Sequence, residues 1–225
     1  MGVSDLRPGM GPDRWFLAFA AAVFVFHQVP AFAGHTAGDA IDVLTPLAVA
    51  GTSIGLIAAF GTPRAAALVA LLAALLYVQG QGIHLAANSI HNEGPTGSVE
   101  DIADFWDERF SHIEALIGWF GLVGAFCLAE QVTARREMRT GILVAGAVVL
   151  GWTFFVSTVE GQTWPLELVA TALFVGWWLR VRRQDQTARP LLTAATAAFA
   201  IGALLIAVWA VLNAGVPEFS DAGII

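Results

Sequence analysis

AAALVALLAALLYVQGQGIHLAANSIH, residues 65–91, begins as an apolar run and ends in polar side chains. A helix of that length rises about 40 Å at 1.5 Å per residue, more than the roughly 30 Å hydrocarbon core of a bilayer. The run therefore predicts a membrane-spanning helix. Within it, Gln81, His84, Asn88 and His91 are separated by steps of three and four, so their side chains share one helical face.

The composition of the whole chain is also typical of a membrane protein. Hydrophobic residues make up 57% of the 225 residues, and the mean hydropathy is +0.70. We predict seven membrane spans, at about 15–33, 40–60, 65–91, 104–131, 140–160, 164–181 and 190–213. Because the connections between them are short, we expect one domain, residues 1–225, folded as an all-α polytopic membrane helix bundle.

The basic residues predict the orientation of this bundle. All of them are arginines, and with seven spans every arginine except Arg109 falls on the same side of the membrane. The positive-inside rule makes that side cytoplasmic, so the N-terminus lies inside and the C-terminus outside. We expect a multi-pass protein of the cell membrane with lipids around it. The absence of lysine from the sequence excludes a retinal Schiff base.

Other features of the sequence exclude partners or leave an alternative open. The net charge of −7 argues against nucleic acid as a partner. The single cysteine, Cys127, excludes an internal disulfide framework. The first span also resembles a secretory signal peptide with a cleavage site after Ala33, and cleavage there would leave six spans in the same orientation. The sequence leaves the oligomeric state open.

Polar side chains of two neighbouring antiparallel spans are expected to meet in the outer half of the bundle. Glu108 and His112 lie four residues apart at the start of the span at 104–131, at the depth of His84 and His91 in the span at 65–91. Ionisable groups at membrane depth usually bind or relay something, and imidazole with carboxylate is a common ligand set for zinc and iron. We predict that His84, His91, Glu108 and His112 bind a divalent metal ion, with zinc favoured and iron possible.

Further polar residues are expected around this metal site. Gln81, Asn88 and Asp107 would orient the histidine rings through their free ring N–H groups. Asp107 or Glu160 would transfer the proton in a catalysed reaction, or Glu108 would do so if it is not a metal ligand. His27 and His35 are expected to serve as hydrogen-bonding partners between helices, because His27 has no helical companion beyond Gln28 and His35 lies in a glycine-rich loop.

His84, followed by Asp107-Glu108 and by Ser111-His112, resembles the pattern of the membrane hydrolase superfamily that contains alkaline ceramidases and adiponectin-type receptors. The resemblance implies a seven-helix fold in which three histidines hold zinc close to a serine and an aspartate. It covers only the spans at 65–91 and 104–131. Members of that superfamily have a His-x-x-x-His pair in the last span, whereas residues 190–213 contain no histidine and no acidic residue.

Three kinds of function fit these observations. We favour a metal-dependent membrane enzyme, a hydrolase or an oxidoreductase, that acts on a lipid or another amphiphile. A b-type haem protein for electron transfer would use two histidines on different helices as axial ligands. A transporter coupled to protons or metal ions would use the same polar layer as its binding site.

Overall fold

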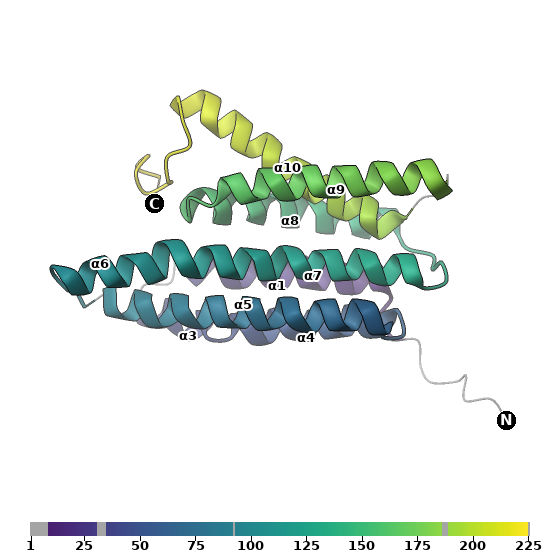
Figure 1. The fold of residues 1–225 in the computed structure, drawn as a ribbon, viewed down its shortest axis with the longest axis horizontal. Coiled ribbons are helices and arrows are strands. Elements are labelled where there is room, and N and C mark those ends of the chain that lie inside the picture. The colour runs from purple at the N-terminus through teal and green to yellow at the C-terminus, as the bar shows by residue number, and fades with distance from the viewer. Residues whose placement is uncertain (1–8, 31–34, 92, 186–188, 225) are drawn as a thin grey trace.

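The computed structural model describes residues 9–30, 35–91, 93–185 and 189–224, and the regular secondary structure of these residues is helical (Figure 1). The helices are α1 (Pro12–Gln28), α3 (His35–Asp42), α4 (Thr45–Ala59), α5 (Arg64–His91), α6 (Ser98–Asp104), the π-helix η1 (Phe105–Ser111), α7 (His112–Val132), α8 (Thr140–Glu160), α9 (Trp164–Asp185) and α10 (Pro190–Asn213). This confirms the all-α fold class. The expected cleavage point between Ala33 and Gly34 lies outside the described residues.

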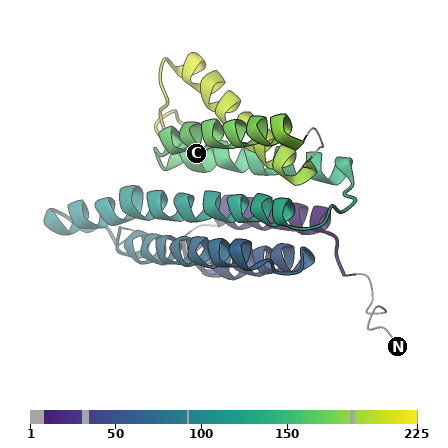
Figure 2. The ribbon, with the colours of Figure 1, turned by 45° about the vertical axis from the view of Figure 1, so that its right-hand side comes forward.

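The helices form two layers whose long axes run in nearly the same direction. α1, α3, α4, α5 and α7 make up one layer, and α8, α9 and α10 make up the other (Figures 1 and 2). α6, η1 and α7 follow one another without a break, so that they extend as a single long rod. The C-terminal half of α10 leans away from the rest of its layer, and the chain after it turns back towards the bundle (Figure 1).

Five helical stretches are long and apolar enough to cross a membrane: Ala40–Ala59, Arg64–His91, Ser98–Val132, Thr140–Glu160 and Pro190–Asn213. They correspond to five of the seven predicted spans. The other two predicted spans are helices that are too short or too polar to be included. α1 has only 17 residues, and α9 carries Glu167 and ends in an arginine-rich turn.

Glycines allow α5 and α7 to pack closely, which determines how their polar residues meet. A Cβ atom on Gly118 would lie 2.4 Å from the backbone nitrogen of Tyr77, and one on Gly80 would lie 2.5 Å from the backbone nitrogen of Ala115. Small residues at such positions let two helix backbones approach each other, as is common between membrane helices. The C-terminal half of α5 is therefore a close neighbour of η1 and of the first half of α7.

The two layers are connected at the end where α7 finishes and α10 begins. Both carboxylate oxygens of Glu130 accept hydrogen bonds from the start of α10, from the backbone N–H groups of Leu191 and Leu192, each at 2.9 Å. These are N–H groups that a helix leaves without intrahelical partners. Glu130 is nearly fully buried, so this contact joins α7 and α10 inside the bundle at that end.

Candidate functional site

A cavity of about 1060 Å³ lies between the two layers at the opposite end of the bundle. One wall consists of polar and ionisable side chains of the first layer: His27, Asp42, Tyr77, Gln81, His84, Asn88, Ser111 and His112. The other wall is richer in aromatic side chains and comes from α8, α10 and the chain that follows α10: Trp152, Phe155, Val156, Ser157, Glu160, Trp209, Glu218, Phe219, Ser220 and Ile224. A cavity of this size holds a ligand as large as a typical cofactor or drug molecule.

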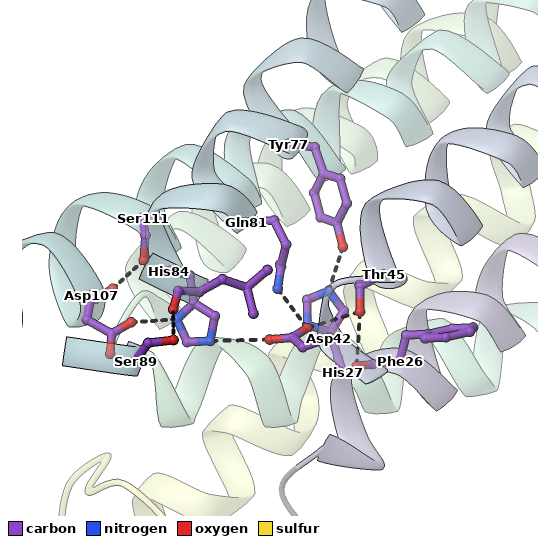
Figure 3. Close-up of polar contacts among 11 residues, drawn as sticks. Phe26, His27, Asp42, Thr45, Tyr77, Gln81, His84, Ser89, Asp107 and Ser111 are labelled. Atoms are coloured by element: carbon purple, nitrogen blue, oxygen red, sulfur yellow. Dashed lines mark hydrogen bonds and ion pairs between the residues drawn. The ribbon is translucent and has the colours of Figure 1, made fainter. Parts of the chain in front are cut away.

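His84 lies on the polar wall between two carboxylates (Figure 3). Its Nδ1 atom is 2.6 Å from Oδ1 of Asp107, and its Nε2 atom is 3.7 Å from Oδ2 of Asp42. The side chain of Asp107 is only 4% exposed, whereas that of His84 is 26% exposed. The ring is thus held from the protein side by a buried carboxylate while part of it stays open to the cavity.

Asp42 is fixed by neighbours on two other helices. Its Oδ1 atom accepts hydrogen bonds from Nε2 of Gln81 at 2.7 Å and from Oγ1 of Thr45 at 3.0 Å (Figure 3). Asp42 is the last residue of the short helix α3, and Pro46 stands in the first turn of α4, where proline is favoured. The break between these two helices places Asp42 in the cavity wall next to His84, and Asp42 is not among the ligands or proton-transfer groups predicted from the sequence.

His112 lies beside His84 on the same wall. The centroids of the two rings are 5.1 Å apart, and the ring planes are tilted by 38°. Gly161 packs against His112 from the other layer, because a Cβ atom on it would be 2.9 Å from Nδ1 of the histidine. The buried hydroxyl of Ser111 donates a hydrogen bond to the backbone carbonyl of Asp107 within η1, the segment that presents Asp107 to His84.

His27 lines the cavity from the end of α1. Its Nε2 atom is 2.8 Å from the hydroxyl of Tyr77, and its ring stacks on Trp119 with centroids 5.3 Å apart and planes 9° from parallel. This contact between α1 and α5 is the hydrogen bond between helices that was predicted for His27. The structure adds that this bond forms in the wall of the cavity that also contains His84 and His112.

The structure separates His91 from His84 and His112. Nδ1 of His91 is 2.9 Å from Oδ1 of Asp104, and both side chains are about half exposed, at 52% and 48%. This pair lies in a second, smaller cavity of about 730 Å³, next to Arg109. The side chain of Glu108, the fourth predicted ligand, lies outside the described part of the structure, as does that of His35.

The remaining predicted site residues lie around the large cavity. Gln81 contacts Asp42, and Asn88 lines the same wall one turn beyond His84. Glu160 lies on the opposite wall, at the end of α8, where its Oε2 atom accepts a hydrogen bond from the backbone N–H of Phe219 at 2.9 Å. Among the described side chains, no group of three or more His, Cys, Asp and Glu residues is arranged so that it could hold a metal ion.

Comparison of the chain with protein-family models, with curated proteins and with solved structures gave no match.

The contacts of His84 define what the polar wall can do chemically. An ionised carboxylate only accepts hydrogen bonds, so the short contact with Asp107 favours a proton on Nδ1 of His84. The Nε2 atom can then accept a proton from a bound molecule, or it can ligate a metal ion. A proton taken up at Nε2 would face the carboxylate of Asp42, 3.7 Å away, which stabilises the imidazolium form.

Proposed function

We propose that this chain is a multi-pass membrane enzyme that acts on a lipid or another amphiphile bound in the large cavity. The observation that carries the proposal is the position of His84, held by Asp107 and facing Asp42 in the wall of a cavity of about 1060 Å³. Ionisable groups placed deep in a membrane helix bundle are costly, and they usually have a role in binding or in proton transfer.

We propose further that the bundle crosses the cell membrane seven times, with α1 and α9 as the two additional spans. Both helices lie lengthwise beside the longer ones in the two layers (Figures 1 and 2). The arginines then collect on the inner side, with the N-terminus inside and the C-terminus outside. The cavity, at the ends of α1, α5 and α8, opens in the outer half of the membrane.

In this proposal His84 is the acid–base group of the reaction. Asp107 orients the ring, and Nε2 removes a proton from the substrate or from a water molecule that attacks it. Asp42 stabilises the charge that forms on the ring, and His84 then returns the proton to the leaving group. Glu160, on the opposite wall of the cavity, is the second group that can exchange a proton with a bound substrate.

As the alternative to proton transfer by His84, we propose that Nε2 of this ring binds a cofactor, a divalent metal ion, zinc or iron, and that Glu160 then transfers the proton. The donor types fit, because the His84 and His112 rings are neighbours and Asp42 faces Nε2 of His84. The described donors do not converge on one point, so the fit is partial. A bound ion would supply Lewis acidity, which polarises a carbonyl group or activates water. Elemental analysis and the visible spectrum of the purified protein test this cofactor, since a Soret band would instead indicate haem.

The enzyme proposal is tested by lipid turnover. The purified protein is inserted into nanodiscs made from a bacterial lipid extract, and the lipids are analysed by mass spectrometry over time. We expect products to accumulate with the wild-type protein and not with His84→Ala. His91→Ala is the matched control, because His91 also pairs with an aspartate but lies outside the large cavity. Equal turnover by wild type and His84→Ala would refute the proposal.

A further inference from the structure

The charge of the large cavity is distributed unevenly, and the wall opposite His84 is acidic. Glu160 of α8 and Glu218 of the C-terminal segment both line this wall. No arginine is among the described residues that line the cavity, and the sequence contains no lysine. On this wall, a ligand with an anionic head group would therefore meet carboxylates and no arginine or lysine side chain.

Three aromatic rings line the same wall of the cavity as these carboxylates, where Phe155 and Phe219 are largely buried and Trp209 packs against them. The centroid of the Trp209 ring is 4.9 Å from that of Phe219, and the centroid of the Phe155 ring is 5.5 Å from that of Phe219. The Phe155 and Phe219 rings meet edge to face. The indole N–H of Trp209 donates to the backbone carbonyl of Pro217 at 2.9 Å, which fixes this ring relative to the C-terminal segment. Aromatic faces next to carboxylates are the surroundings that favour organic cations, above all substituted ammonium groups.

The backbone connects the acidic and aromatic groups into one unit. Glu160 accepts the N–H of Phe219, the residue that follows Glu218, so the two carboxylates are held near each other at the end of the cavity. Burial and the negative charges of Glu160 and Asp221 raise the pKa of Glu218 above its ordinary value. A cation bound between Glu160 and Glu218 would relieve this repulsion.

The smaller cavity has a similar charge and adjoins the large one. Gly161 and Glu218 line both cavities. Asp101, Asp104 and Glu218 line the smaller cavity together with a single arginine, Arg109. In the proposed topology it lies on the outer side, so an approaching cation meets a predominantly acidic surface before it reaches Glu160. Such a surface raises the local concentration of cations.

The large cavity also has a place for an apolar chain. Trp152 lines it, and 46% of this large apolar side chain is left uncovered by the described part of the chain. Trp152 precedes Glu160 by eight residues on α8, which corresponds to about 12 Å along the helix at 1.5 Å per residue. A ligand with its head group at Glu160 can therefore extend its chain deeper into the membrane and out past Trp152.

We infer that the cavity binds an amphiphile whose head group is an organic cation, with the charged group between Glu160 and Glu218 and the rings of Phe155, Trp209 and Phe219 around it. This inference rests on the proposed function, because it names the substrate class of the same cavity. The head group lies on the wall opposite His84, so that the part of the ligand next to the charged group extends towards the His84 and His112 rings.

The experiment is a calorimetric titration of the protein, purified in a neutral maltoside detergent, with three soluble ligands of equal chain length: hexyltrimethylammonium, hexyl glucoside and hexyl sulfate. We expect the ammonium ligand to bind at one site per chain and more tightly than the other two. The double variant Glu160→Gln/Glu218→Gln should weaken this binding about tenfold or more, since a tenfold change corresponds to the loss of one favourable charge contact of about 1.4 kcal/mol. Glutamine keeps an oxygen that can accept the N–H of Phe219, so the C-terminal segment stays in place.

Two controls make the result specific. Glu100→Gln removes an exposed carboxylate of α6 that lines neither cavity, and it should leave the affinity unchanged. Trp209→Ala should weaken binding of the ammonium ligand more than binding of the glucoside, because only the cation gains from the ring face. Equal affinity for all three ligands, or an affinity for the ammonium ligand that the double glutamine variant does not change, would overturn the inference.

The same titration with His84→Ala separates the two proposals. We expect this variant to keep one ammonium site per chain while it loses lipid turnover, because the charged group of the ligand lies between Glu160 and Glu218 on the other wall. If the wild-type protein binds the ammonium ligand but turns over no lipid, the enzyme proposal is wrong and the inference that the cavity binds a cationic amphiphile is kept. If the protein turns over a neutral lipid, if this turnover requires His84, and if the cavity does not prefer cations, then only the inference of a cationic head group is wrong and the enzyme proposal is kept.

Discussion

Gly118 of α7 lies directly against the backbone of Tyr77 in α5, where a Cβ atom on the glycine would be 2.4 Å from the tyrosine nitrogen. Tyr77 in turn contacts His27 through its hydroxyl, so this close approach of two helices is coupled to the wall of the cavity. The packing of α5 on α7 therefore supports both the fold and the site.

We predict that Gly118→Ala destabilises the protein by about 1–3 kcal/mol, because the added methyl group meets backbone atoms that cannot move independently. Thermal unfolding in detergent measures the effect. Gly124→Ala is the control on the same helix, since a Cβ atom there would meet nothing within 4 Å. Equal melting temperatures for the two variants would show that the close approach of α5 and α7 is not required for stability.

The proposed topology predicts which loops can be reached from outside the cell. Single cysteines introduced by Gly97→Cys and Ser220→Cys should react with a membrane-impermeant maleimide in intact cells, whereas Arg136→Cys should not. The natural Cys127 is buried, so the wild-type protein measures the background of the maleimide labelling. If only the five longest helical stretches crossed the membrane, with the N-terminus inside, the loop with Arg136 would lie outside, so external labelling of Arg136→Cys would contradict seven spans.

The overall fold followed from the sequence because long apolar runs have few alternatives in a bilayer. The run at 65–91 became α5, and the runs at 140–160 and 190–213 became α8 and α10 with nearly the same ends. Length and apolar character alone predict such helices, since every backbone group must be paired within the helix in lipid. The five longest helical stretches are those in which this argument is strongest.

The site was harder to predict because its details depend on departures from regular helices. The expected shared face of Glu108 and His112 assumed an α-helix, whereas Phe105–Ser111 is a π-helix. A π-helix bonds residue i to i+5, so the angle between successive side chains differs from that of an α-helix, and in η1 it is Asp107 whose side chain contacts His84. His91 lies two turns beyond His84 and pairs with Asp104 instead of joining the cavity.

The proposed metal cofactor predicts how the metal content of the purified protein changes in variants. If a zinc or iron ion is bound, His84→Ala and His112→Ala should each lower the metal content per chain, while His91→Ala should retain it, because only the first two rings are neighbours. Asn88→Ala should weaken binding less, by about 10–100-fold in affinity, as expected for a group that orients a ligand. Inductively coupled plasma mass spectrometry measures the metal. Unchanged content in both His84→Ala and His112→Ala would place any ion elsewhere.

The contact between His84 and Asp107 is the centre of the functional proposal, and Asp107→Asn tests it with little change of shape. The amide cannot hold the ring as the carboxylate does, so we expect turnover of the lipid substrate in nanodiscs to fall by about 10²- to 10⁴-fold. Asp104→Asn makes the same change in the exposed pair with His91 and should leave turnover within about twofold of wild type. The rate of product formation by these two variants, measured by mass spectrometry, is the most direct test. Loss of turnover in Asp107→Asn alone is the predicted result, and wild-type turnover in a folded Asp107→Asn protein would contradict the account.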